Sequence, residues 1–220
     1  MLNRKWFDYT FIALGLLVQV VTFVVANHWA EPSSQLSVLS LISGCFGVLS
    51  VCLASQGNIL TFLFGFAQVG TYTYLCVTQR FYGEIAINIY YFITMIYGVY
   101  AWRKRLDNKE NKVVTRRLRW KTAILLLAAT VLLSWLVGWG LASFTDDTQP
   151  YLDAYTTVPA LVAQVLMILV FWEHWFIWLA VDILSVVLWL RAADYCMAAQ
   201  YVFWCANCIY GLYNWRRLAQ

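Results

Sequence analysis

The sequence is short of charge. Charged residues make up 12% of its 220 positions, whereas a soluble domain is about a quarter charged, so an ordinary soluble fold is excluded. The only histidines are His28 and His174, and the chain lacks the HExxH, GxSxG and GxxxxGKS/T patterns. The usual metal, nucleophile and phosphate-binding motifs of enzymes are therefore missing. We expect a protein that is not an enzyme and that holds no metal or cofactor.

Further absences argue against a retinal protein, an enzyme with a pair of acids and an ion channel. Beyond the N-terminus, every lysine lies within residues 103–121, which leaves none in mid-span for a retinal Schiff base. Asp182 has no second mid-span aspartate with which to form an acid pair. No ring of acidic or carbonyl-rich repeats suggests an ion filter, so a channel stays only as a distant alternative. Cys205 and Cys208 have no second CxxC and no histidine near them, and we expect them to pack rather than to bind metal.

Apolar sequence is abundant. Hydrophobic residues make up 62% of the chain, and its mean hydropathy is +0.66. Because a helix needs about 20 mainly apolar residues to cross a bilayer, the pattern predicts an all-α integral membrane protein with about eight spans. The predicted spans are residues 7–26, 36–54, 58–77, 84–102, 120–143, 155–171, 174–190 and 197–215. The sixth and seventh spans are separated at "WEHW", residues 172–175.

Positive charge predicts the orientation of these spans. Every Lys and Arg except Arg80 and Arg191 lies near the termini or in the run 103–121. With an even number of spans these segments fall on one side, and cytoplasmic loops retain basic residues, so we expect both termini in the cytoplasm. The run 103–121 lies between two spans. We therefore interpret it as a topology determinant that can also contact anionic lipid, and not as a nucleic-acid surface.

The sequence also repeats itself. "IYGVYAWRK" at 96–104 is matched by "IYGLYNWRR" at 209–217, a shift of 113 positions, and a period of this length indicates the duplication of a unit of several helices. We divide the chain into an N-terminal extra helix and loop (1–35), a first three-helix repeat (36–104), a basic loop with a linker helix (105–150) and a second three-helix repeat (151–220). The linker helix returns the chain to its starting side. The two repeats are thus expected to run parallel around a central cavity, as in sugar-transporter folds.

The seventh predicted span carries the most distinctive side chains. A set of residues at steps of three and four shares one face of this helix: Trp175, Trp178, Asp182, Ser185 and Trp189. A carboxylate near the bilayer centre is costly and marks a functional site, and indole rings attract cations. This face therefore predicts a flat, positively charged ligand. The alternative is that the tryptophans form interfacial belts and that Asp182 pairs with a donor such as Asn207.

Polar residues on the other repeat helices are candidates for the same site. The matching face of the first repeat carries Thr61, Phe64, Gln68 and Tyr72, and further polar groups lie in the fourth, sixth and eighth spans. Lone amides also bridge neighbouring membrane helices for about 1 kcal/mol, so a structural role stays open for each. The substrate-binding residues that we select are Trp175, Trp178, Asp182, Gln68, Asn88, Tyr91, Asn207 and Gln164.

Several segments resemble the PnuC-type nicotinamide riboside transporters. They are "WFIW" at 175–178, which is similar to the paired-tryptophan motif of that family, "YGVYAW" at 97–102 and "ASQGNILTFLFGFAQV" at 54–69. The resemblance covers residues 40–104 and 160–217. It implies a bacterial inner-membrane vitamin transporter that works without an energy source. It further implies that the substrate is trapped by phosphorylation in the cytoplasm and that the protein assembles as a homotrimer.

Two positions depart from the pattern of that family. Asp182 stands where the resemblance leads us to expect an amide, and Asn88 stands where it leads us to expect glutamine. Relatives in the family carry thiamine or riboflavin, and nicotinamide riboside and thiamine are both aromatic monocations. The tryptophan face and the carboxylate do not separate these two cations. We expect nicotinamide riboside first and keep thiamine, or riboflavin, as the alternative.

Overall fold

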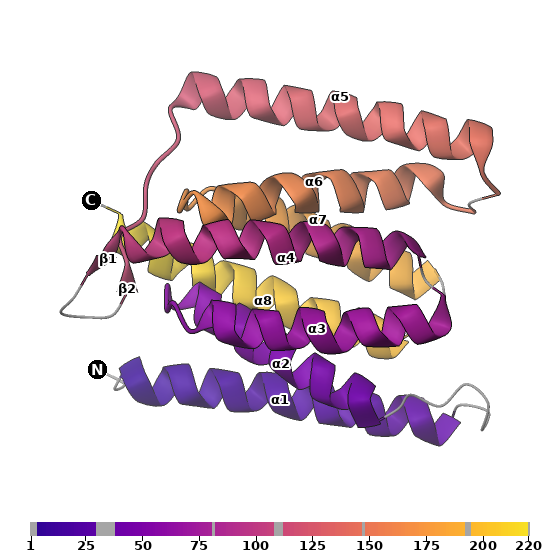
Figure 1. Ribbon diagram of the computed structural model, residues 1–220, viewed down its shortest axis with the longest axis horizontal. Helices are drawn as coiled ribbons and strands as arrows, with labels where there is room; N and C mark the ends of the chain where they lie inside the picture. The colour runs from indigo at the N-terminus through magenta and orange to yellow at the C-terminus, as the bar shows by residue number, and fades with distance from the viewer. Residues whose placement is uncertain are drawn as a thin grey trace. The chain divides into compact units, whose positions relative to one another are not determined.

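The computed structural model describes residues 4–29, 38–80, 82–107, 112–146, 148–191 and 195–219. Within these ranges the regular elements are eight α-helices and one short two-stranded sheet (Figure 1). They are α1 (Arg4–Trp29), α2 (Val38–Ser55), α3 (Thr61–Gln79), α4 (Tyr82–Arg103), β1 (Leu106–Asp107), β2 (Lys112–Val113), α5 (Trp120–Phe144), α6 (Pro150–Ile168), α7 (His174–Arg191) and α8 (Tyr195–Leu218). The all-α class predicted from composition is confirmed.

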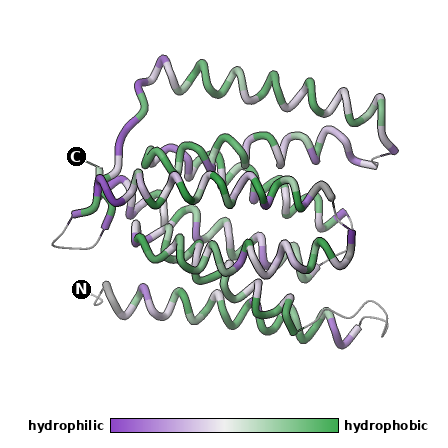
Figure 2. Tube along the Cα trace, in the orientation of Figure 1, coloured by the Kyte–Doolittle hydropathy of each residue, from purple (hydrophilic) through white to green (hydrophobic). Residues whose placement is uncertain are grey.

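Six of these helices, α1, α2, α4, α5, α6 and α7, are long and apolar enough to cross a membrane. The other two, α3 and α8, have 19 and 24 residues, or roughly 28 and 36 Å at 1.5 Å per residue, but polar side chains such as Gln68 in α3 and Asn214 in α8 lower their hydropathy. Figure 2 shows apolar residues along the helices and hydrophilic residues gathered in the segment before α5. The chain is a multi-pass membrane protein.

The boundaries of α6 differ from those predicted. The helix begins at Pro150 rather than at 155, because proline fits the first turn, where its missing N–H would have no partner in any case. It ends at Ile168 rather than at 171, and Val170 just beyond it has a left-handed backbone with φ 61°, which a helix interior does not accommodate. The next helix begins at His174. The predicted break at "WEHW" is therefore confirmed.

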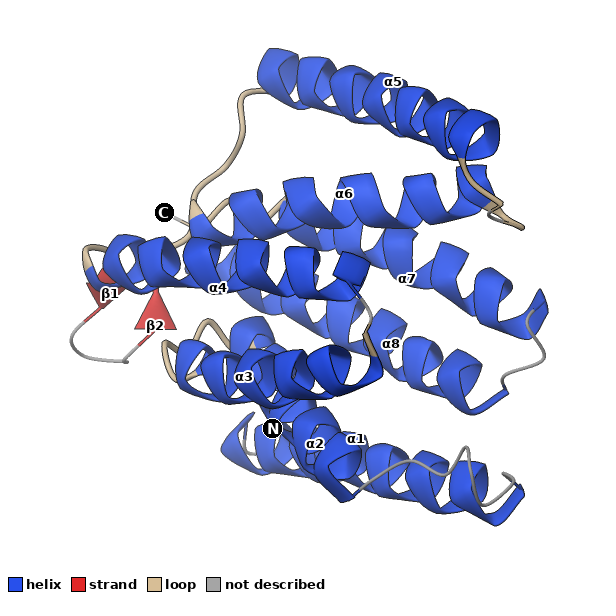
Figure 3. Ribbon diagram, turned by 45° about the vertical axis from the view of Figure 1, so that its right-hand side comes forward, coloured by secondary structure: helices blue, strands red, loops and turns tan. Residues whose placement is uncertain are grey.

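Contacts divide the chain into two units, Met1–Val114 and Thr115–Gln220. In unit 1, α1 packs on α2, α2 on α3 and α3 on α4. In unit 2, α5 packs on α6, α6 on α7 and α7 on α8, and α5 lies alongside α6 in both ribbon views (Figure 1 and Figure 3). Each unit is one helix followed by a packed group of three.

The repeat seen in the sequence has the same spacing in the two units. α7 starts 113 positions after α3 (174 against 61), and α8 starts 113 positions after α4 (195 against 82). The turns that precede α3 and α7 also match, since each has a left-handed residue, Gly57 with φ 68° and Val170 with φ 61°. Both copies thus keep the same spacing between the starts of their second and third helices and the same left-handed turn between their first and second helices.

The segment before α5 bonds to backbone carbonyls in unit 1. The N–H of Val113 donates to O of Gly57 at 2.9 Å, and the N–H of Val114 donates to O of Arg105 at 2.8 Å. The strands β1 and β2, which the sequence does not predict, pair Leu106 with Val113 beside these bonds. One extended stretch of chain thus holds both the turn before α3 and the end of α4.

Unit 2 has the matching arrangement. The N–H of Arg116 donates to O of Val170 at 2.8 Å, and the N–H of Thr115 donates to O of Leu218 at 3.1 Å. These two acceptors follow the acceptors of unit 1 by 113 positions, from 57 to 170 and from 105 to 218. The linker therefore bonds to two carbonyl groups in each repeat, at equivalent positions. Residues 113 and 114 bond first to the turn and then to the end of the last helix in unit 1, whereas residues 115 and 116 bond to these sites in the reverse order in unit 2.

Glu173 adds a side-chain anchor in unit 2. Its Oε1 accepts a hydrogen bond from the N–H of Leu118 at 2.9 Å. Burial raises the pKa of the Glu173 carboxyl, while its backbone hydrogen bonds and the charges of Arg117 and Arg216 oppose the rise. The chain leading into α5 is thereby fixed to the turn before α7.

We expect substitutions of the left-handed residue to change the thermal stability in opposite directions in the two repeats. Gly57→Ala should lower the thermal stability, because a Cβ in the left-handed region costs about 1–2 kcal/mol. Val170→Gly should raise it by less, since glycine also loses more conformational entropy on folding. Thermal unfolding in detergent checks both, with Gly70→Ala as a control, because a Cβ there meets nothing within 4 Å. A loss of stability in both variants would contradict strain at Val170.

Candidate functional site

Asp182 lies in the middle of α7. It is 6% exposed, and its Oδ2 accepts a hydrogen bond from Sγ of Cys208 on α8 at 3.1 Å. In the part of the chain that the structure describes, no cationic side chain pairs with this carboxyl group. A charged aspartate at the centre of a membrane helix costs about 3 kcal/mol on insertion scales. A carboxylate held by one thiol is therefore suited to attract a cation.

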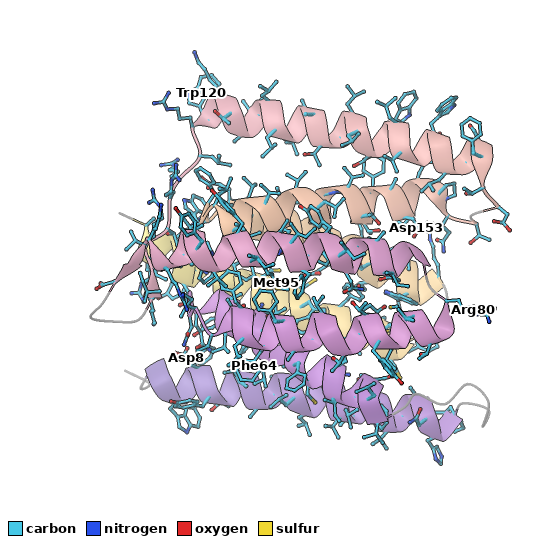
Figure 4. All side chains as sticks on the ribbon, viewed as in Figure 1. Asp8, Phe64, Arg80, Met95, Trp120 and Asp153 are labelled. Carbon is cyan, nitrogen blue, oxygen red and sulfur yellow. The ribbon has the colours of Figure 1, made fainter. Side chains whose placement is uncertain are left out.

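The equivalent positions in unit 1 are apolar. Val69 and Met95 stand 113 positions before Asp182 and Cys208, and they are 5% and 7% exposed. Met95 lies between α4 and α3 (Figure 4), and its Sδ would be 2.9 Å from a Cβ on Gly65. The fold therefore accepts an apolar pair at these positions, and the acid–thiol pair belongs to the second repeat alone.

Trp175 has a packing role at the start of α7. It is 3% exposed and lies edge to face with Trp215 of α8, with ring centroids 6.0 Å apart. A Cβ on Gly211 of α8 would lie 2.5 Å from its indole. Unit 1 has the same edge-to-face pair in Phe62 and Trp102, at 5.0 Å. The ring therefore locks α7 against α8, and its Nε1–H has no hydrogen-bond partner among the described residues.

Trp178 is the more accessible of the two tryptophans. It lies one turn before Asp182 on the same face of α7 and is half-buried. It makes no ring contact with the aromatic residues of the described segments. Ser185 continues this face and is 5% exposed. The α7 face thus combines an accessible indole, a carboxyl group and a hydroxyl group.

Two further selected residues lie on the neighbouring helices of unit 2. Gln164 on α6 is 6% exposed, and Asn207 on α8 is fully buried at 0%. The donor on α8 that Asp182 meets is Cys208 and not Asn207, which corrects the alternative pairing suggested by the sequence. α6, α7 and α8 therefore carry five of the selected side chains within one unit, and their convergence on one ligand stays a prediction.

The remaining selected residues lie in unit 1. Gln68 and Tyr91 are half-buried, and Asn88 is 3% exposed, with its Nδ2 donating to a carbonyl of its own helix at 2.8 Å. Thr61, which the sequence places on the same face as Gln68, joins α3 to α2. Its Oγ1 donates to O of Ser50 at 2.8 Å, and Oγ of Ser50 donates to its O at 2.9 Å. Thr61 is therefore a packing residue.

Sequence reasoning assigns Cys208 to packing and misses its bond to Asp182. Successive residues of a helix point about 100° apart, so the rotation of α8 decides whether Asn207 or Cys208 faces α7, and hydropathy does not set that rotation. The sequence does contain one signal. A shift of 113 positions aligns the polar pair with Val69 and Met95, and a change from apolar to polar at two facing positions marks them as special.

Two repeats of three membrane helices, with an acid buried in mid-span, define a transporter of small molecules. Residues 37–217 match the model of a known family, which is described as the nicotinamide mononucleotide transporter. The chain belongs to this family. The resemblance inferred from the paired tryptophans and the repeat ends is confirmed.

Individual relatives match between 76% and 97% of this chain. The nicotinamide riboside transporter PnuC of Haemophilus influenzae is 31% identical over 93% of this chain and 90% of its own length. That of Neisseria mucosa is 30% identical over 97% and 82%, and that of Escherichia coli is 24% identical over 76% and 80%. A crystal structure of the vitamin B3 transporter PnuC matches with a TM-score of 0.76 and 30% identity, covering 96% of this chain and 91% of that one.

We expect the contact between Trp175 and Gly211 to be sensitive to added volume. Gly211→Ala should lower the free energy of unfolding by about 1–3 kcal/mol, because a Cβ there forces the indole to move in a packed interior. Gly140→Ala in α5 is the matched control, since its Cβ would meet nothing within 4 Å. Thermal unfolding of the two variants in the same detergent measures the difference. Equal stability would contradict a tight α7–α8 contact.

Proposed function

We propose that this chain carries nicotinamide riboside across a bacterial inner membrane by facilitated diffusion, and that phosphorylation in the cytoplasm traps the substrate. The observation that supports the substrate best is Asp182, a mid-span carboxyl group whose only hydrogen-bond partner in the described residues is a thiol. The relatives that carry the name of nicotinamide riboside transporters support the same substrate.

The chemistry of the ligand fits this face of α7. Nicotinamide riboside has a flat pyridinium ring with one positive charge, and Asp182 supplies the opposite charge. The accessible indole of Trp178 adds a cation–π attraction of about 0.5–2 kcal/mol, depending on desolvation. The buried Trp175 holds α7 in place and offers its Nε1–H. We propose the amides of Gln164 and Asn207 as hydrogen-bonding groups for the carboxamide and ribose.

Unit 1 carries its own proposed substrate-binding residues. Gln68, Asn88 and Tyr91 supply hydrogen-bonding groups without charge. The residues proposed in the first repeat are thus all uncharged, whereas the set proposed in the second repeat includes the acid Asp182.

A phosphorylated substrate fits these residues less well. A phosphate monoester carries about two negative charges at neutral pH, and it would need a buried cation in the absence of water. Among the described side chains, every Lys and Arg is at least partly exposed. The buried acid Asp182 would also repel the phosphate. We therefore propose the riboside, and not the mononucleotide of the family description, as the substrate.

Thiamine is the second candidate, because it is also an aromatic monocation that Asp182 would attract. Riboflavin is uncharged and gains nothing from the carboxylate. Since charge does not separate nicotinamide riboside from thiamine, direct competition between the two ligands decides their order.

The proposal includes topology and assembly. The basic segment 103–121 and the basic ends of the chain support a cytoplasmic location for both termini, and the family resemblance implies a homotrimer. Cysteine labelling of the termini in intact cells tests the first point. The mass of the solubilised complex tests the second.

Transport should be passive. Proteoliposomes that contain the purified protein should take up labelled nicotinamide riboside until the inside and outside concentrations are equal, because the family resemblance implies facilitated diffusion and the sequence has no nucleotide-binding motif. Labelled thiamine is measured in parallel, and liposomes without protein give the leak. Accumulation above the outside concentration under a proton or sodium gradient would refute facilitated diffusion.

The charge of Asp182 should set affinity for cationic ligands. Asp182→Asn keeps the shape and the hydrogen-bonding oxygen but removes the charge, so the binding free energy of nicotinamide riboside should weaken by roughly 1–3 kcal/mol. The reduced, uncharged form of the riboside should lose far less. Asp146→Asn, in the exposed loop before α6, is the matched control.

Binding of both ligands is measured after the variants have been shown to have equal thermal stability. Equal losses of binding free energy for the charged and the uncharged ligand would contradict a charge-pairing role for Asp182. Unchanged binding of both would remove Asp182 from the site.

A further inference from the structure

Cys208 is the one described side chain that bonds to Asp182. Its Sγ donates to Oδ2 at 3.1 Å, and the two residues are 3% and 6% exposed. The other carboxyl oxygen, Oδ1, has no hydrogen-bond partner in the segments that the structure describes. The bond crosses from α8 to α7, so it ties the direction of the carboxyl group to the position of the second helix.

The fold does not require this pair. In unit 1 the equivalent residues are Val69 and Met95, which are buried without any charge. Because the same helix arrangement forms around an apolar pair, packing alone does not explain why an acid and a thiol occupy these positions in the second repeat. Their presence therefore points to a role in binding a ligand.

The choice of a thiol is chemically specific. A thiol is a weak hydrogen-bond donor. A cationic donor or several N–H groups would bind the carboxylate strongly and compensate its charge within the protein. A single thiol fixes one oxygen in place and leaves the charge and the second oxygen free. This arrangement orients the carboxylate without neutralising it.

We propose that Cys208 is a positioning residue that holds Oδ2 of Asp182, directs Oδ1 to a ring cation and so sets the preference for charged over uncharged substrates. This inference rests on the proposed function of the α7 face. It adds a second residue, on a different helix, to the determinants of that preference.

Removal of the donor is the direct test. Cys208→Ala should weaken binding of nicotinamide riboside about three- to tenfold, the effect of one ordinary hydrogen bond, because a thiol is a weak donor, and should change binding of the reduced, uncharged riboside less than about twofold. Cys208→Ser supplies a hydroxyl donor at the same place and should restore binding to within about twofold of the original protein. Cys205→Ala, one turn earlier on α8 and half-buried, is the matched control and should change neither ligand.

A double-mutant cycle separates positioning from packing. If Cys208 acts through the carboxylate, Cys208→Ala should have no further effect on affinity in the Asp182→Asn background, since coupled residues are not additive. Thermal unfolding of each protein comes first. Should the alanine variant be unstable, Cys208→Val fills the volume and also lacks a donor, so it takes the same place in the cycle.

The possible outcomes are distinct. Equal weakening of both ligands by Cys208→Ala, the same loss in the Asp182→Asn background, or failure of the serine variant to recover affinity would each overturn the positioning role. If the original protein binds no nicotinamide riboside, the proposed function itself fails. If it binds and is weakened by Asp182→Asn but not by Cys208→Ala, the proposed function stands and only the inference about Cys208 fails.

Discussion

In a bilayer every backbone N–H and C=O must find its partner within the protein, because lipid offers none. This constraint makes the spans helical, and carbonyl groups at or just beyond the helix ends also find partners within the protein. The carbonyls of Gly57 and Arg105 in unit 1, and those of Val170 and Leu218 in unit 2, accept bonds from the linker. The linker, although it is not helical, thus makes equivalent backbone hydrogen bonds with each repeat.

The duplication supplies an internal control on what the fold needs. Both copies keep a left-handed turn and a buried edge-to-face aromatic pair, Phe62 with Trp102 and Trp175 with Trp215. Features present in both copies are explained by packing, and Trp175 falls in this group despite its place in a family motif. The acid and the thiol occur in one copy only, so packing does not explain them.

Hydropathy and charge are properties of whole segments, which is why the sequence predicts the spans, the repeat and the break before His174. What it does not predict depends on single backbone angles or on helix rotation. The left-handed Val170 shortens α6, and the rotation of α8 turns Cys208 rather than Asn207 toward Asp182. Burial of Trp175 against Gly211 requires knowledge of a neighbour 36 positions away, from 175 to 211, which no periodicity within α7 contains.

The free-energy cost of the buried Asp182 carboxylate links the duplication to the proposed function. A carboxylate inside a membrane helix costs about 3 kcal/mol on insertion scales, and a thiol donor offsets only part of that cost. Under the proposed function, a cationic ligand beside Asp182 would offset the rest, so the carboxylate would be stabilised when the ligand is bound. The first repeat, with Val69 and Met95 at these positions, bears no such cost. Under the function proposed above, duplication would allow one copy to preserve the packing while the other carries a destabilising acid that binds the substrate.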